Sequence, residues 1–412
     1  MDDNDPLRTL RERFHIPKRS DGANTIYFCG NSLGLQPKAV RQEVELILRD
    51  WETQGVEAHF QGKEPWVTYH NLLNEQTATI VGAFPEEVTV MNGLTVNLHL
   101  MLVSFYRPTK ERHRIMIEAN AFPSDQYAIK SHIRFHGHDP ARSLIEFQPR
   151  EGETRIRTED IETFLSKEGD SVALVMLGGV NYYTGQAFEI ERITRSAHAK
   201  GCIAGYDLAH SAGNVKLQLH DWDVDFAVWC SYKYLNSGPG GVAGCFVHRK
   251  HGERDDLPRF AGWWGHDKET RFLMGPDFWP IPGAEGWQVS NAPILALAAQ
   301  RASVQIFDDV GMDKLRAKSE LLTGYLEFLL DQKSNGSYSI ITPPDKNHRG
   351  AQLSVRIKEG GKGLLAKLAD KGVVVDWREP DVIRVAPVPM YNTFTEVYDF
   401  VETFSRLLGS EK

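Results

Sequence analysis

A lysine and an aspartate that follow two apolar segments have the clearest chemistry in this chain. Asp207 ends the segment CIAGYDL, and Lys233 comes shortly after the next segment, DFAVWC. A lysine amine can form a Schiff base with an aldehyde cofactor, and a carboxylate can keep that cofactor's pyridinium nitrogen protonated, so that the ring accepts electrons. Tyr232, beside the lysine, could donate to a phosphate or move a proton. Alone, Lys233 would be taken for a solvated lysine and Asp207 for a possible helix N-cap; together they predict a cofactor site.

A glycine-containing turn could hold the phosphate of such a cofactor. In MNGLTVNLHL (residues 91–100), Thr95 stands between Gly93 and an apolar helical pattern. The unpaired N–H groups at the start of a helix bind anions well. An ordinary helix N-cap is the alternative interpretation of this stretch.

The segment AFPSDQY (residues 121–127) could contact the ring of the cofactor. It follows the apolar segment RIMIEAN, so Phe122 could stack on a planar ring and Asp125 could reach its polar edge. A loop with an aromatic plug and an N-cap aspartate remains the alternative. His210, three residues after Asp207, is a weak signal by itself.

An arginine in the last hundred residues needs a carboxylate partner. Arg384 lies in DVIRVAPVPMYN (residues 381–392), among apolar neighbours. A guanidinium in such surroundings must be paired, either with a structural acid or with a substrate carboxylate. The sequence leaves both possibilities open.

Three other patterns are set aside. SGPGGVA (237–243) has the glycine spacing of a dinucleotide fingerprint, but a strand-like segment follows it where the fingerprint needs a helix. DWDVD (221–225) resembles the start of a calcium loop but lacks its glycine and late glutamate. HIRFHGHD (132–139) has two histidines four residues apart with no acid or cysteine to complete a metal site, so we expect a polar surface helix end.

The elements that must position these residues alternate along the middle of the chain. Apolar segments of strand length occur at 114–120, 171–180, 202–208, 225–230 and 242–248, and helical patterns separate several of them. This alternation predicts an α/β fold with a mostly parallel sheet covered by helices on both faces. Ligands bind beyond the carboxyl ends of the strands in such sheets, so Asp207 and Lys233 should lie at the same edge.

The chain divides into three regions by pattern. With 412 residues it is long enough for about two domains. We expect an N-terminal arm over residues 1–60, a large α/β domain over 61–310, and a small α+β domain over 311–412, where short alternating strands lie between helices.

Composition excludes several classes of protein. The net charge of −8 and the absence of a basic block argue against a nucleic-acid partner. No apolar run approaches the roughly 18 residues of a membrane helix, and the acidic N-terminus has no signal core, so we expect a cytoplasmic protein with no membrane partner. The cysteines are far apart and form no metal pair, so we expect reduced thiols at Cys29, Cys202, Cys230 and Cys245.

Taken in order, the motifs resemble one enzyme family along residues 25–400. They are NSLGLQP, LTVNLHL, FPSDQYA, NYYTGQ, DLAHSAGN, SYKYLNSGPGG, GWWGH, VSNAP and IRVAPVPMYN. This set is similar to the kynureninase family, pyridoxal-phosphate enzymes related to class V aminotransferases. The resemblance implies the aspartate-aminotransferase fold (fold type I), pyridoxal 5′-phosphate as cofactor, and a homodimer with shared active sites.

The resemblance also implies roles for individual residues. Lys233 would bind the cofactor covalently and Asp207 would pair with its ring nitrogen. The other implied cofactor contacts are Leu94, Thr95, Phe122, Asp125, His210, Tyr232, and, from the neighbouring subunit, Trp263 and Asn291. Gly178 stands where some relatives have a serine that contacts the cofactor, so that contact is in doubt here. The implied substrate contacts are Ser32, His59, His266, Asn291 and Arg384.

The implied reaction is hydrolysis of the Cβ–Cγ bond of L-kynurenine or its 3-hydroxy derivative, a step of tryptophan catabolism and NAD biosynthesis. The products would be L-alanine and anthranilate or 3-hydroxyanthranilate. Lys233 would remove the α-proton, and Tyr232 is the candidate proton donor. His266 and Asn291 resemble positions of relatives that prefer the hydroxylated substrate, because hydrogen-bonding groups near the aryl ring can reward a hydroxyl. We therefore expect both substrates to be cleaved, the hydroxylated one somewhat better, although Trp264 is bulkier than the phenylalanine of those relatives.

Three other functions compete with this interpretation. A cysteine desulfurase or small aminotransferase would share the fold, but a desulfurase needs a reactive loop cysteine, and Cys29 is the nearest to that description. A non-catalytic module would not need Lys233, Asp207 and Arg384 together. A nicotinamide dehydrogenase is disfavoured by the strand-like segment after the glycines.

Overall fold

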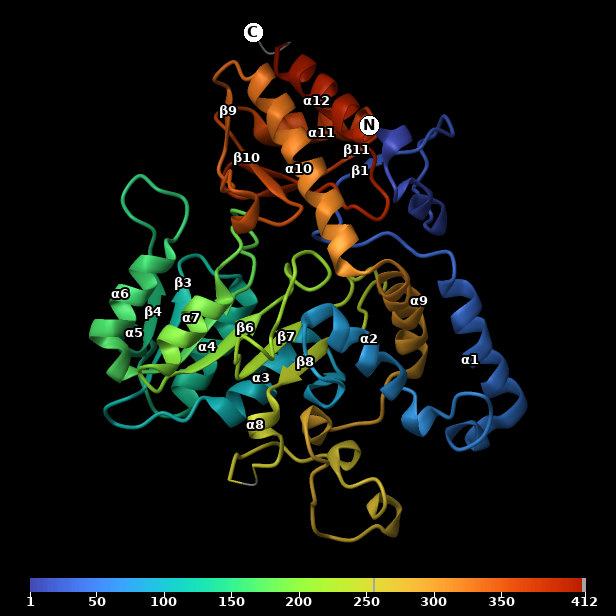
Figure 1. Cartoon of the computed structure of the whole chain (residues 1–412), viewed down its shortest axis with the longest axis vertical. Helices are drawn as coiled ribbons and strands as arrows, with labels where there is room; N and C mark the ends of the chain where they lie inside the picture. Colours follow the sequence, from blue (N-terminus) through green and yellow to red (C-terminus); the bar gives the residue numbers. More distant parts are fainter. Residues whose placement is uncertain (255, 410–412) are drawn as a thin grey trace.

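A seven-stranded sheet forms the centre of the computed structural model, which describes residues 1–254 and 256–409 (Figure 1). Residues 255 and 410–412 of the expected large and small domains lie outside the described residues. The strand order is β2-β8-β7-β6-β5-β3-β4, and only β8 runs antiparallel to its neighbours. The expectation of a mostly parallel sheet is confirmed for these strands: β2 (Val88–Val90), β3 (Arg114–Glu118), β4 (Leu144–Phe147), β5 (Val172–Gly178), β6 (Ile203–Asp207), β7 (Phe226–Trp229) and β8 (Gly244–Val247).

Helices cover both faces of this sheet, which is why its strands are apolar on both sides. Along β3, Ile115 and Ile117 pack with α3 and α4, whereas Met116 belongs to the core on the opposite face. This alternation follows from the two-residue period of a strand. The helices of this part of the chain are α2 (Asn71–Val81), α3 (Leu94–Phe105), α4 (Pro123–Phe135), α5 (Pro140–Ser143), α6 (Thr158–Glu168), α7 (Ile190–His198), α8 (Arg249–Gly252) and α9 (Ile294–Val310).

Local sequence explains where the helices nearest the site begin. Helix α4 starts at Pro123, and proline suits a first helical position because its missing N–H would be unpaired there anyway. Helix α3 starts directly after Gly93, as the glycine-containing turn predicts. At the other end of the region, Gly311 has a φ of 83°, a conformation that favours glycine, and there α9 gives way to α10 (Met312–Lys333).

The C-terminal part of the chain forms a separate antiparallel sheet. Its strand order is β12-β13-β10-β9, and its bounds are Asp376–Arg378, Val382–Val385, Leu353–Ile357 and Tyr338–Ile340 respectively. Helices α10, α11 (Gly361–Asp370) and α12 (Phe394–Gly409) pack with these strands in one apolar core. An α+β arrangement is therefore confirmed here.

The N-terminal segment packs against this C-terminal part. Strand β1 (Ile26–Tyr27) pairs in parallel with β11 (Val373–Val374), and the Asp2 carboxylate accepts hydrogen bonds from the first N–H groups of α12. Helix α1 (Val40–Gln54) lies beside α9 instead (Figure 1). The expected first helix is a 3-10 helix, Arg8–Arg13. The three domain boundaries stay a prediction.

Two expectations need comment. The expected polar surface helix end is wrong for His132, which is buried and whose Nε2 lies 3.0 Å from Nδ1 of His99 on α3. His136 follows the last residue of α4 and is partly exposed, as expected of a helix end. Among the residues that the structure describes, no helix is long and apolar enough to cross a membrane.

Candidate active site

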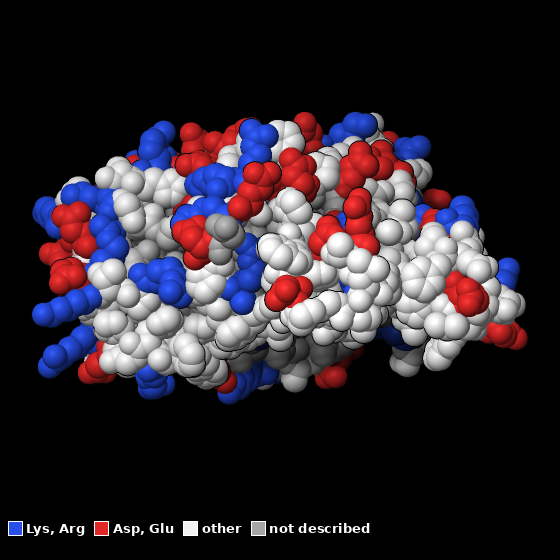
Figure 2. All heavy atoms as spheres, turned by 90° about the horizontal axis from the view of Figure 1, so that it is seen from below, with Lys and Arg blue, Asp and Glu red and all other residues white. Residues whose placement is uncertain are grey.

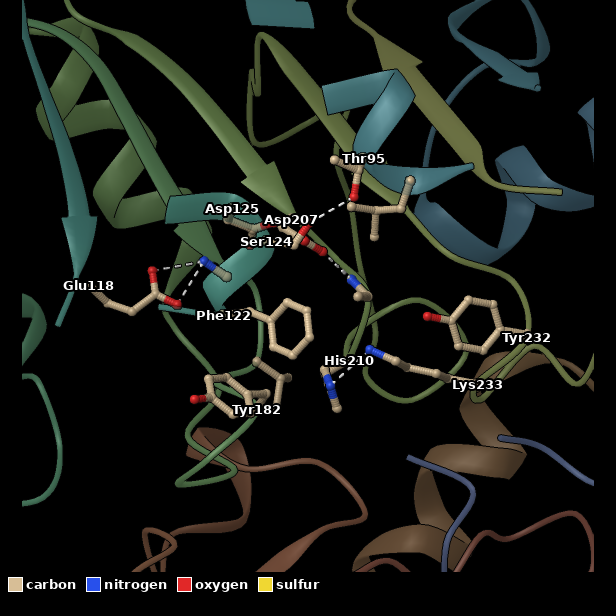
Figure 3. Close-up of a pocket in the computed structure, with 14 residues that line it drawn as sticks. Thr95, Glu118, Phe122, Ser124, Asp125, Tyr182, Asp207, His210, Tyr232 and Lys233 are labelled. Atoms are coloured by element: carbon tan, nitrogen blue, oxygen red, sulfur yellow. Dashed lines mark hydrogen bonds between the residues drawn. The ribbon is translucent and has the colours of Figure 1, made fainter. Parts of the chain in front are cut away.

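A pocket lies at the carboxyl edge of the large sheet (Figure 3). It brings together nine of the residues that the sequence singled out: Leu94, Thr95, Phe122, Asp125, Gly178, Asp207, His210, Tyr232 and Lys233. Five more residues complete the lining, namely Glu118, Ser124, Val180, Tyr182 and Ala209.

Three neighbouring parallel strands deliver one side of this pocket. Glu118 ends β3, Gly178 ends β5 and Asp207 ends β6, and Gly178 is the register partner of Asp207. Lys233 follows β7, whose Val228 pairs with Asp207. The expectation that Asp207 and Lys233 share one sheet edge is confirmed, because both line the pocket that parallel strands create at their carboxyl ends.

Lys233 points into the pocket between aromatic and basic neighbours. Its Nζ lies 3.0 Å from Nε2 of His210, and 5.9 Å from the ring centroids of both Phe122 and Tyr232. Burial, and then the charge of Lys233, lower the pKa of His210 well below its usual range. A neutral imidazole can accept a hydrogen bond from the lysine amine, so His210 can hold the amine in place.

Three carboxyl groups are buried around the pocket. Burial raises the pKa of Asp207, while the hydrogen bond from the Ala209 N–H and the charge of Lys233 oppose that rise. Burial and the neighbouring Asp207 raise the pKa of Asp125 well above its usual range. Burial also raises the pKa of Glu118 to about 7, although its carboxylate accepts the Gly178 N–H. A cationic group bound beside these acids would lower their pKa values and favour their ionised forms.

Two polar atoms of the pocket lack partners. Within residues 1–254 and 256–409, Oδ1 of Asp125 and Nδ1 of His210 are buried without a hydrogen bond. Buried polar atoms are nearly always paired, so these two are suited to a bound group. Figure 3 shows the Phe122 ring between Asp125 on one side and Tyr182 on the other.

The start of α3 forms the anion-binding end of the pocket. The Thr95 hydroxyl lies 2.9 Å from the Ser124 hydroxyl, and the helix N–H groups beside it are not used within the helix. Tyr232 lines the pocket as well, and burial, followed by the proximity of Cys230, raises the pKa of its phenol to about 12. The phenol therefore stays protonated and can donate a hydrogen bond.

Arg384 lies behind the pocket, in β13. Its carboxylate partner is Asp376 on β12, which accepts from Nε at 2.7 Å and also from Nη2. Nη1 donates to the carbonyl oxygen of Tyr182, a residue of the pocket lining, and Nη2 donates to the Ser32 hydroxyl at 3.0 Å. The choice that the sequence left open is partly resolved: Arg384 has a structural partner and also touches the pocket wall.

Four of the expected site residues lie elsewhere in this chain. His59, Trp263, His266 and Asn291 do not line the pocket. His59 packs edge-on against Trp66, Trp263 against Phe272, and Asn291 is exposed. Both ring nitrogens of His266 are paired inside its own loop, Nε2 with the Thr270 hydroxyl and Nδ1 with the Trp279 N–H.

Sequence reasoning missed Glu118, Ser124, Tyr182 and Asp376. Glu118 ends the apolar segment RIMIE just as Asp207 ends its own strand, so the same signal was present. Asp376 could be found only through the register of two strands, in which it stands directly across from Arg384.

Comparison with known proteins completes the description of the chain. The family model "Kynureninase C-terminal domain" matches residues 315–404. Curated proteins named kynureninase are similar over almost the whole length: 59% identity in Koribacter versatilis and 58% in Myxococcus xanthus, each over 98% of this chain and 95% of the relative.

Solved structures of low sequence identity have the same fold. A C-DES mutant with glycine linked covalently to its PLP cofactor superposes with a TM-score of 0.80 at 16% identity, over 96% of this chain and 98% of that one. A cysteine desulfurase from Thermococcus onnurineus gives a TM-score of 0.76 at 18% identity, over 94% and 95% of the two chains.

Proposed function

The chain belongs to the kynureninase family, and from this premise we propose that it hydrolyses the Cβ–Cγ bond of L-kynurenine or 3-hydroxy-L-kynurenine. The products are L-alanine and anthranilate or 3-hydroxyanthranilate. The observation that carries the proposal is the pocket that joins Lys233, Asp207 and the helix start at Thr95, with Arg384 behind its wall.

The residues of the pocket fit pyridoxal 5′-phosphate. Phe122 and the buried Asp207 carboxylate, whose neighbour Asp125 has an unpaired oxygen, would hold its protonated pyridine ring. The phosphate would be held by the N–H groups of Leu94 and Thr95 at the start of α3. When bound, this cofactor supplies an aldehyde that condenses with amines and a ring that stabilises negative charge on the substrate's α-carbon.

Glycine at position 178 has a reason in this pocket. A Cβ atom there would lie 2.9 Å from Oε1 of Glu118, so the end of that side chain would have to shift. The chain thus replaces the hydroxyl of some relatives by a glycine beside a buried acid. We propose that Gly178 contributes backbone and space, and no side-chain contact, to cofactor binding.

Lys233 serves as the attachment point and then as the base. Once its amine is free, it can take the proton from the α-carbon of the substrate. His210, which is kept neutral by burial, accepts a hydrogen bond from that amine and so directs it. The Asp207 carboxylate holds the proton on the ring nitrogen, because a neighbouring negative charge favours the protonated form.

Tyr232 is the proposed proton donor for the carbon that becomes the alanine methyl group. Its raised pKa keeps the proton available at neutral pH, and its ring lies on the same side of the pocket as Lys233 (Figure 3). A hydrogen bond to the cofactor phosphate is compatible with this role, because a hydroxyl both donates and accepts.

Arg384 and Ser32 form the proposed site for the substrate's α-carboxylate. Guanidinium and carboxylate groups form paired, charge-assisted hydrogen bonds, and the fold brings Arg384 against the pocket wall through Tyr182. His59, His266 and Asn291 would contact the rest of the substrate. Preference for the 3-hydroxylated substrate stays a prediction. To bind the substrate hydroxyl, His266 would have to give up its hydrogen bond with the Thr270 hydroxyl.

A homodimer would bring the distant residues to the pocket. The face in Figure 2 has a broad area with few charged side chains, and large exposed apolar residues gather in the segment that it views: Trp263, Phe272, Leu273, Met274 and Trp279. An apolar area of this kind is typical of a protein interface. We propose that it covers the neighbouring subunit's pocket, placing Trp263 and Asn291 beside that cofactor. A cytoplasmic location remains a prediction.

Substitution of Lys233 tests the proposal directly. Lys233→Ala should abolish the visible absorbance of the bound cofactor and lower anthranilate release by at least about 10,000-fold, since nucleophile and base are both removed. The exposed Lys314→Ala is the matched control and should keep both. If Lys233→Ala retained absorbance and anthranilate fluorescence, the proposed mechanism would be wrong.

A desulfurase activity is disfavoured by the two cysteines near the pocket wall among the described residues, Cys29 and Cys230. Burial raises the pKa of the Cys230 thiol, which contacts the Ala209 carbonyl oxygen of the pocket. Burial, and then the charge of Asp376, raise the pKa of the Cys29 thiol to about 11. A thiolate is the reactive form of cysteine, so Cys29 is a poor nucleophile at neutral pH.

A further inference from the structure

Asp376 is the centre of a buried charge cluster beside the proposed carboxylate site. Its Oδ1 accepts from Nε of Arg384, and its Oδ2 accepts from Nη2 of Arg384 and from the Ser32 hydroxyl. Nη2 of Arg378 lies 3.3 Å from the same Oδ2. Three side chains from two distant parts of the chain are thus held by one carboxylate.

The geometry divides the guanidinium of Arg384 into two edges. Asp376 occupies the side edge, formed by Nε and one hydrogen of Nη2. The end edge, formed by Nη1 and the other hydrogen of Nη2, faces the Tyr182 carbonyl and the Ser32 hydroxyl. A carboxylate can bind at the end edge when it replaces the Ser32 hydroxyl and the Tyr182 carbonyl as acceptors, because the hydrogen bonds to Asp376 do not use that edge.

The charges of the cluster do not cancel. Arg378 and Arg384 carry two positive charges, and Asp376 is the acid that contacts both of them within the described residues. Although burial opposes it, the hydrogen bonds from Arg384 and Ser32 lower the pKa of Asp376, so that it is charged at neutral pH. One positive charge is left over, which matches a single carboxylate group on a ligand.

We propose that Asp376 is a positioning residue for the substrate: it fixes Arg384 side-on so that the end edge is presented to the α-carboxylate, while Arg378 offsets the negative charge of Asp376. This inference rests on the proposed function. The strand register supports this inference, because Asp376 and Arg384 are direct partners across β12 and β13. The ion pair that holds Arg384 is therefore part of a sheet and not of a mobile loop.

A purely structural ion pair would behave differently from a positioning pair. Loss of a structural partner lowers stability and active fraction without a selective effect on substrate affinity. Loss of a positioning partner raises KM for a carboxylate-bearing substrate and leaves the chemistry of the cofactor intact.

The experiment compares Asp376→Asn with Asp381→Asn in the cofactor-loaded enzyme. Asp381 pairs with Arg356 in the same part of the fold and does not touch Arg384. Asp376→Asn should raise KM for kynurenine by about 10-fold or more, change kcat by less than about 3-fold and leave the cofactor absorbance unchanged. Asp381→Asn should leave KM unchanged. An unchanged KM in Asp376→Asn, or an equal rise in both variants, overturns the proposal.

A double substitution separates positioning from general electrostatics. In an Arg384→Lys background, the further change Asp376→Asn should have little additional effect on KM, since a lysine ammonium has no planar guanidinium group for Asp376 to orient. Full additivity of the two changes would contradict the proposal.

A milder variant covers the case in which Asp376→Asn does not fold. The half-buried Arg378→Gln should raise KM by about 3-fold or more, more at low salt than at high salt, because it removes the excess positive charge. A KM equal to the wild type would contradict the charge argument.

The same variants distinguish failure of the inference from failure of the proposed function. Titration with L-alanine, followed by the cofactor spectrum, measures carboxylate binding without bond cleavage. Weakened L-alanine binding in Asp376→Asn supports the positioning role even if the wild type does not release anthranilate. Normal binding rejects the role even if the enzyme is a kynureninase.

Discussion

Buried acids at the two edges of the large sheet have opposite electrostatic surroundings. At the carboxyl edge, Glu118, Asp125 and Asp207 are buried close together, and burial raises the pKa of all three. At the amino edge, Glu87 and Asp225 are equally buried, but basic and N–H groups surround each of them. One fold thus contains a group of buried acids with no cationic hydrogen-bond donor among the described residues, in which Asp125 has an unpaired oxygen, and another group whose carboxylates are paired at both oxygens.

The amino edge shows what a satisfied buried acid looks like. Asp225 accepts from Nε2 of His198 at 2.7 Å, Nε2 of His251 at 2.8 Å and the Ala204 N–H at 2.8 Å, and Lys250 is 3.0 Å away. Although burial acts to raise it, the hydrogen bonds from the two histidines and the charge of Lys250 lower the pKa of Asp225.

This difference indicates which buried acids lower the stability of the fold and are available for a chemical role. Burying an unpaired carboxylate costs free energy, whereas a fully hydrogen-bonded one can be stabilising. Of the acids at the carboxyl edge, Glu118 and Asp207 accept hydrogen bonds from backbone N–H groups, and Asp125 Oδ1 has none within the described residues, which fits their proposed role beside a cationic ring. Substitutions at the two edges should therefore affect different properties of the protein.

The largest effect should follow from Asp207→Asn. Asparagine cannot hold the ring nitrogen protonated, so kcat/KM should fall by about 100- to 1,000-fold. The cofactor-free protein should unfold at the same urea concentration as the wild type or a higher one, because a destabilised acid has been removed. Steady-state anthranilate release measures the expected loss of activity, and urea denaturation measures the expected stability. A large loss of stability without loss of activity would contradict the proposed difference between the acids at the two sheet edges.

Asp225→Asn should give the converse result. Removing one partner of a buried ion cluster costs about 3–5 kcal/mol, so the free energy of unfolding should fall by that order while kcat of the folded enzyme stays within about 2-fold of the wild type. Because the pKa of Asp225 is lowered in the fold, its stabilisation is present at neutral pH and is lost as pH falls below about 4.

Urea denaturation at pH 7 and at about pH 3, below the ordinary pKa of aspartate, measures this effect. The exposed Asp221→Asn, four residues earlier, is the control and should not change stability. Equal losses for the two variants would show that the cluster around Asp225 contributes nothing specific.

The smallest effect should be a change of pH dependence in Glu118→Gln. Burial raises the pKa of Glu118 from 4.5 to about 7, so the folded protein keeps a proton that the unfolded chain releases. The wild type should therefore lose up to about 3 kcal/mol of unfolding free energy as pH rises from 5 to 8. Glutamine cannot ionise, so this loss should shrink in the variant.

The measurement is urea denaturation of the cofactor-free protein across that pH range. Glu146→Gln on the neighbouring strand β4 is the matched control, since Glu146 is exposed and should leave the slope unchanged. A wild-type slope in Glu118→Gln would mean that Glu118 is ionised in the fold.

The sequence predicted the parts that depend on local pattern. Near-continuous apolar segments located the strands, and acids or amines directly after them located Asp207 and Lys233, because parallel strands end at a common edge. Glu118 gave the same signal but had no obvious chemical partner. Asp376 stayed hidden because strand register depends on the intervening turn, which spacing alone does not determine. Trp263 and Asn291 are exposed, and a single chain contains no signal for what covers them, whereas His266 is buried and paired within its own loop.

Contacts between the first and the last residues of the chain determine which binding site can form first during synthesis. The hydrogen bond from the Phe394 N–H to Asp2 spans 392 residues, and Ser32 reaches Asp376 across 344. Closing loops of this length is slow, and the chain is made from its N-terminus, so these contacts form only after synthesis is almost finished. The Lys233 pocket can be assembled while the chain is still growing, but the site for the substrate's carboxylate cannot. A nascent chain should therefore be able to bind cofactor before it can bind substrate.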